Sequence, residues 1–122
     1  MTPHIQAYDP GADYFFREGC HINELANSAQ DPGVSIARAR VEPGTSTRWH
    51  ALAGIDERYV ILEGQGRVEL ADNAADTVSP GDVVLIPAET PQRITNTGRA
   101  DLVFLAICSP RFRPEAYRDL EA

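Results

Sequence analysis

The sequence contains no lysine: its eleven basic residues are all arginines, against eighteen aspartates and glutamates. Without lysine the chain cannot form a Schiff base or use a side-chain amine as a general base. The formal net charge of −7 and the lack of a basic stripe argue against a nucleic-acid partner. Arginine still offers a planar group that binds carboxylates or phosphates through two hydrogen bonds.

Cysteine and long apolar runs are also scarce. Cys20 and Cys108 are too few for a disulfide framework, and we expect buried thiols in a reducing compartment. No run approaches the roughly 18 apolar residues of a membrane helix. The first residues have neither the basic nor the apolar region of a signal peptide. Together these absences predict a cytoplasmic protein with no membrane partner.

Proline and glycine recur at short intervals, and the segments between them are short and rich in β-branched residues, as in Val34–Val41 and Leu102–Ile107. This pattern, without a long helical period, predicts a single all-β domain, a sandwich or barrel. We expect an N-terminal arm at 1–33 with one strand near Cys20–Leu25, a β-barrel at 34–109, and a tail at 110–122 with a short helix over Pro114–Leu120.

Two spaced motifs carry a family resemblance. Gly44, His50, Leu52, Glu57 and Gly64 fit the first cupin motif, G(X)5HXH(X)3-4E(X)6G, except that Leu52 replaces its second histidine. The stretch 81–96 is similar to the second motif, G(X)5PXG(X)2H(X)3N, with Glu89 at its glycine and Gln92 at its histidine, and it ends at Asn96. The resemblance implies an antiparallel cupin β-barrel, also called a jelly roll or double-stranded β-helix. It also implies a homodimer with N-terminal strands exchanged or paired between subunits.

Cupin barrels hold one divalent metal through two histidines and a glutamate of the first motif and one histidine of the second. The resemblance therefore places His50, Glu57 and Gln92 at three ligand positions and Leu52 at the fourth, where no donor exists. One nitrogen and two oxygens make a poor site for Mn, Zn, Ni, Fe or Mg. We expect a divalent metal to be weakly held or absent.

Strand alternation would place Arg48 on the same face as His50, and Tyr59 on the same face as Glu57. Arg48 could then pair with Glu57 in place of a metal, or clamp an anionic substrate. His50 is equally consistent with a hydrogen-bonded histidine that binds no metal. Gln92 could simply hydrogen-bond Glu57 or a water molecule.

Other residues leave alternatives open. Arg38 and Arg40 project to one face of a strand, which could be either the surface or the lumen. His21 could supply a missing ligand if the N-terminal arm folds over the barrel mouth. Trp49 should point away from His50, toward packing or a subunit contact.

Three functions are consistent with these residues. The first is an enzyme that performs a proton transfer, isomerisation or lyase-type elimination on a small anionic or polar substrate. Its catalytic residues would be Glu57, His50 and Arg48, with Arg48, Tyr59 and Gln92 binding the small-molecule ligand. The second is a non-catalytic metabolite-binding or sensing protein. The third is a metal-dependent dioxygenase, which the missing histidines disfavour.

Overall fold

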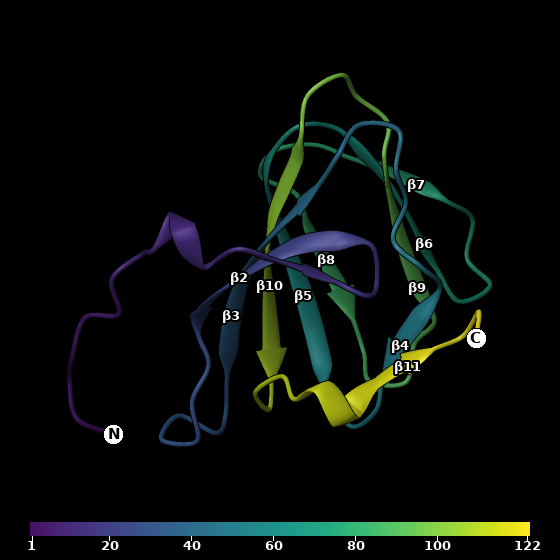
Figure 1. Cartoon of the computed structure of the whole chain (residues 1–122). Coiled ribbons are helices and arrows are strands. Elements are labelled where there is room, and N and C mark those ends of the chain that lie inside the picture. The colour runs from purple at the N-terminus through teal and green to yellow at the C-terminus, as the bar shows by residue number, and fades with distance from the viewer.

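The computed structural model describes all 122 residues and shows an all-β chain with only two short helical turns (Figure 1). Neither turn is long or apolar enough to cross a bilayer. The strands are β1 (Tyr14–Phe16), β2 (Cys20–Ala26), β3 (Ser35–Val41), β4 (His50–Leu52), β5 (Asp56–Glu63), β6 (Gly66–Leu70), β7 (Asp76–Val78), β8 (Val83–Ile86), β9 (Gln92–Asn96), β10 (Leu102–Ser109) and β11 (Tyr117–Asp119). The 3₁₀ turns are η1 (Pro10–Ala12) and η2 (Pro114–Ala116).

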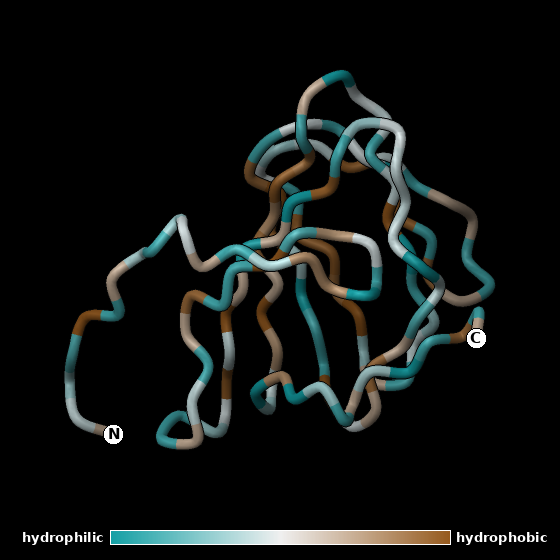
Figure 2. The backbone as a smooth tube through the Cα atoms, viewed as in Figure 1, coloured by the Kyte–Doolittle hydropathy of each residue, from teal (hydrophilic) through white to brown (hydrophobic).

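The strands form two antiparallel sheets. One has the order β1-β2-β3-β10-β5-β8 and the other the order β11-β4-β9-β6-β7. The main apolar core draws side chains from both sheets, including Ile61 and Phe104 from the first and Ile94 from the second. Figure 2 shows hydrophobic segments along the strands, while the connecting loops are mainly hydrophilic.

The expected closed barrel is not formed. Hydrogen bonds divide the strands into two sheets with free edges, and packed side chains join the sheets across the interior. A closed barrel needs a strand ladder that runs round the whole sheet. Here three of the four edge strands are short, so their ladders end before the sheets meet: β1, β7 and β11 have three residues each.

The expected C-terminal helix is also wrong. Only the turn η2 is helical, and the chain then extends as β11 along β4, with Tyr117 opposite Leu52 and Asp119 opposite His50. The free edge of β4 offers backbone hydrogen bonds to an extended chain, and a short polar helix would leave that edge unpaired. This strand places Tyr117 against the imidazole of His50.

The N-terminal arm contributes more than the single strand that the sequence predicted. The expected strand near Cys20–Leu25 is β2, and β1 pairs with it in a hairpin, with Phe16 opposite Cys20. The tight turn between them uses Gly19 at a φ of +103°, a conformation that glycine adopts without strain. The first residues extend away from both sheets (Figure 1).

Two motif positions show why the cupin spacing suits this backbone. Gly64 has a φ of +86°, and a Cβ there would lie 2.6 Å from the Asp101 carbonyl oxygen. Glu89 stands where the second motif has glycine, and it also takes a left-handed φ of 69°. Its side chain accepts a hydrogen bond of 2.7 Å from the Gly54 amide. This bond helps to hold a conformation that costs a non-glycine residue about 1–2 kcal/mol.

Candidate functional site

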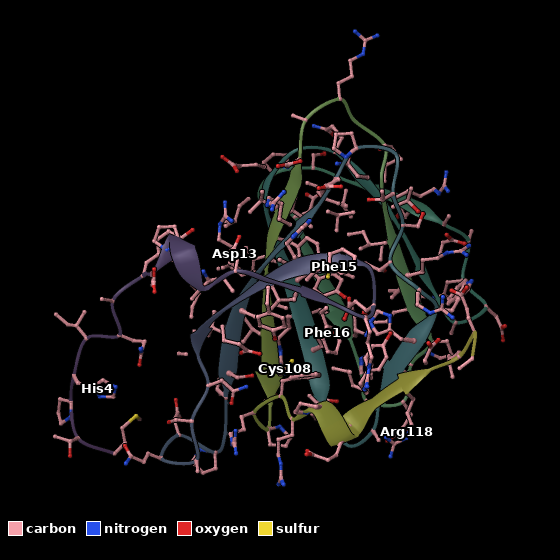
Figure 3. The ribbon with its side chains drawn as sticks, in the orientation of Figure 1. His4, Asp13, Phe15, Phe16, Cys108 and Arg118 are labelled. Atoms are coloured by element: carbon pink, nitrogen blue, oxygen red, sulfur yellow. The ribbon has the colours of Figure 1, made fainter.

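A small pocket lies between the β1–β2 hairpin, the inner face of β3 and β10, and the C-terminal segment. Its volume of about 40 Å³ leaves room for a few water molecules or a small ligand group. Polar and aromatic side chains share its wall: Tyr14, Phe16, Glu18, Glu24, Glu57 and Phe112. Figure 3 shows Phe16 and Cys108 in the body of the molecule, with His4 far away on the arm.

Glu57 on the pocket wall begins a hydrogen-bonded chain of three buried side chains. The Gln92 amide group donates to Glu57 Oε1 at 2.9 Å, and the Tyr59 hydroxyl donates to Gln92 Oε1 at 2.5 Å. Each of the three residues is at most 8% exposed. β5 supplies Glu57 and Tyr59 from alternate positions, and β9 supplies Gln92 from the opposite sheet. Buried polar groups need such partners, so this chain fixes the carboxyl of Glu57 in one orientation.

The carboxyl of Glu57 has a pKa raised from 4.5 to about 7. Burial is the main cause, because removal from water disfavours the charged form, and the negative charge of Glu18 adds to the effect. The hydrogen bond from Gln92, the nearby His50 and the thiol of Cys108 act in the opposite direction and lower this pKa. The Cys108 thiol lies 3.6 Å from Glu57 Oε2.

His50 begins β4 and is 1% exposed. Its Nδ1 lies 2.6 Å from the carbonyl oxygen of Arg48; a carbonyl can only accept, so Nδ1 carries the hydrogen. The other nitrogen, Nε2, faces Glu18 Oε2 at 3.7 Å. The ring stacks on Tyr117 with centroids 5.3 Å apart. His50 is therefore held on three sides, with Nε2 directed at a carboxylate.

Arg48 does not pair with Glu57, which was one of the alternatives that the sequence left open. Arg48 Nε donates to Asp119 Oδ2 at 2.9 Å, and the arginine side chain is 40% exposed. β4 begins only at His50, so the strand alternation on which the prediction depended does not extend back to Arg48. The backbone amide of Arg48 instead bonds the carbonyl of Glu18. No arginine lines the pocket, and the expected anion clamp is missing from it.

The residues present do not fit the four-donor metal site that the resemblance implies. Leu52 is 4% exposed and packs in an apolar cluster with Ile55, Cys108 and Tyr117. The oxygen and the nitrogen of the Gln92 side-chain amide each form a hydrogen bond with a protein group, and Glu57 Oε1 accepts one of these bonds. No group of three or more His, Cys, Asp and Glu side chains is placed to hold a metal ion.

Glu18 is the site residue that the sequence did not reveal. It lies in the turn between β1 and β2, with its side chain 14% exposed, and it lines the pocket together with Glu57. It belongs to neither cupin motif. The only hint in the sequence was its position next to Gly19, which marks a turn but not the direction in which that turn folds.

The remaining candidates lie outside the pocket. His21 Nε2 is 3.3 Å from Glu42 Oε1, so His21 does not supply a missing ligand to the interior. The adjacent residue, Cys20, is buried and only 1% exposed. Arg40 pairs with Asp101 at 3.4 Å.

Trp49 lies in the first motif and contacts Arg93, which lies in the second motif. The guanidinium of Arg93 lies 4.6 Å from the centroid of the indole ring. Arg93 also binds Glu69 through two hydrogen bonds, of 2.9 and 3.0 Å. Packing is therefore one role of Trp49 in the single chain.

Comparison with known proteins places this fold in a family. A family model described as "Cupin domain" matches residues 37–108, more than half of the chain. The chain is 36% identical over 116 residues to the uncharacterized protein MJ1618 of Methanocaldococcus jannaschii, a match covering 93% of this chain and 92% of the relative. It is 39% identical over 73 residues to an oxalate-binding protein of Thermotoga maritima, covering 59% of each.

A solved structure agrees at the level of the fold. The Streptomyces nucleoside dehydratase Pac13 superimposes with a TM-score of 0.77 and 18% identity, over 98% of this chain and 92% of that one. At this identity the likeness shows a shared fold and no more. The matched motifs, the two-sheet architecture and the family match lead to one conclusion: the chain belongs to the cupin family.

Proposed function

We propose that this protein is an enzyme that moves a proton on a small polar molecule, with the carboxyl of Glu57 as general acid and base. The observation that carries the proposal is a buried carboxyl on the pocket wall whose pKa is about 7. A proton donor or acceptor is most effective when its pKa lies near the working pH. Isomerisation and elimination both require such a group.

The neighbouring side chains have supporting roles in this proposal. Gln92, itself held by the Tyr59 hydroxyl, donates to one oxygen of Glu57 and leaves Oε2 with only a long contact to the Cys108 thiol. Oε2 would therefore exchange the proton with the substrate. His50 Nε2 is directed at Glu18, and with both ring nitrogens protonated the imidazolium would hold that carboxylate in place on the wall of the same pocket. Every step uses groups of this chain alone.

Because no arginine lines the pocket, we narrow the class of substrate that the sequence had allowed. The sequence allowed an anionic or a polar substrate because Arg48 could have faced the interior. Since Arg48 binds Asp119, the proposal keeps the polar substrate.

The proposal is tested by a metabolite screen in two stages. Small polar metabolites that raise the melting temperature identify ligands, because a molecule that binds only the native state stabilises it. Each ligand is then incubated with the protein in D₂O and followed by ¹H NMR. We expect a new product, or loss of a carbon-bound proton signal through exchange with solvent. Ligands that stabilise the protein but show neither product nor exchange would instead indicate a metabolite-binding protein.

We also propose that the protein forms a homodimer through its N-terminal hairpin. β1 is an edge strand of the larger sheet, and Phe15 on it is 64% exposed. A free strand edge and an exposed aromatic ring both favour pairing with a second copy. Multi-angle light scattering should give twice the chain mass of 13.4 kDa. A single monomer peak across the working concentration range would contradict this.

A further inference from the structure

The pocket wall combines carboxylates with very little positive charge. Three glutamates line it, and no arginine does. Glu24 has only neutral partners, the amide of Asn27 at 3.3 Å and the hydroxyl of Tyr14 at 3.4 Å. The contacts of Glu57 are also neutral, and only Glu18 faces a side chain that can be cationic.

Aromatic rings line the same pocket beside these carboxylates. Phe16 and Phe112 pack edge to face with centroids 6.0 Å apart, and Tyr14 packs on Phe16 at 6.5 Å. The same cluster already holds a cation of the chain: the guanidinium of Arg17 lies 5.5 Å from the Phe16 ring and 4.8 Å from the Tyr117 ring. Rings beside carboxylates are a recurring way to bind an ammonium group, because ring faces and carboxylates both attract positive charge.

We propose that this pocket binds a small molecule bearing an ammonium group and rejects carboxylates such as oxalate. The inference rests on the proposed function, since the amine would be the substrate on which Glu57 acts. It separates this chain from its relative named as an oxalate-binding protein. A dicarboxylate needs a cationic partner when it leaves water. The pocket offers neither an arginine nor the family's four metal donors.

A two-carbon probe series of matched size tests the charge preference directly. Ethanolamine is a cation at neutral pH, ethylene glycol is neutral, and glycolate and oxalate are anions. Each is titrated into the full-length protein with EDTA present and at constant ionic strength, with calorimetry and thermal unfolding as readouts. We expect ethanolamine to bind with a Kd of about 1–10 mM and glycolate and oxalate not to bind. An anion that binds as tightly as ethanolamine, or ethanolamine that does not bind, overturns the proposal.

Variants locate the bound amine in the pocket. The Glu18→Gln and Glu24→Gln variants should each raise the Kd for ethanolamine about tenfold, because each removes one negative charge from the pocket wall. Glu115→Gln is the matched control, since that carboxylate is 75% exposed and lies outside this pocket. Equal binding by all three variants would overturn the assignment. None of these results depends on turnover, so a protein that binds amines but shows no proton exchange would refute only the catalytic proposal.

Discussion

The Glu57→Gln variant is expected to gain about 3 kcal/mol of stability relative to the wild type as the pH rises from about 4.5 to above 7. The native carboxyl has a pKa of about 7, against 4.5 in the unfolded chain. Between these values the native state binds more protons than the unfolded state, so wild-type stability falls as the pH rises. Glutamine does not titrate, and the variant lacks this loss.

Urea unfolding of both proteins across this pH range measures the effect. The informative quantity is the difference between their free energies of unfolding, because the other carboxyl groups titrate equally in both. Glu115→Gln serves as control, since its carboxylate is exposed and should leave the wild-type curve unchanged. Parallel curves for Glu57→Gln and the wild type would show that Glu57 titrates normally. Once a substrate is known, the same variant should lower turnover by roughly 10²- to 10⁴-fold.

The Gln92→Leu variant is expected to lose about 2–5 kcal/mol of stability. Leucine has nearly the volume of glutamine but can neither donate to Glu57 nor accept from Tyr59. Both groups would then be buried without this partner, and a buried polar group without a hydrogen bond costs about 1–3 kcal/mol. The variant should also raise the pKa of Glu57 above about 7, since the bond from Gln92 lowers it.

Chemical denaturation below pH 7 measures the loss, with Glu57 protonated in both proteins. Gln65→Leu is the control because Gln65 is exposed and its side chain makes no hydrogen bond in the structure. A cycle with Tyr59→Phe separates the two contacts, because the double variant should cost less than the sum of the single ones. A Gln92→Leu protein within about 0.5 kcal/mol of the wild type would mean that the hydrogen-bonded chain does not stabilise the fold.

The fold was largely predictable because its signals are local. Turn residues and the spacing of the two motifs predicted the strands that carry His50, Glu57 and Gln92, and these strands form. The glycine positions of the motifs report backbone conformations, as at Gly64, where a side chain would collide with Asp101. The motif residue Asn96 similarly bonds the carbonyls of Val41 and Ala100. The contacted groups can lie far along the chain, but each requirement is recorded in the sequence as one residue type at one motif position.

The errors came from contacts between distant parts of the chain. The tail segment Pro114–Leu120 is short enough to form either a helix or a strand. It forms a strand because the free edge of β4 offers backbone hydrogen bonds to it. That strand brings Asp119 beside Arg48, which is 71 positions away, and so removes the arginine from the interior. Strand alternation could not reveal this, because it applies only where a strand continues.

The sequence alone predicted an all-β chain resembling the cupins, with Glu57 and Gln92 facing a common interior and Leu52 at the position of a metal ligand. Only the tertiary structure decided that Glu18 lies beside His50, that Arg48 points outward, and that the pocket is rich in carboxylates and aromatic rings. The reason is physical. Strands and turns follow from residues adjacent in the chain, whereas the charge of a pocket depends on which distant segments fold against it.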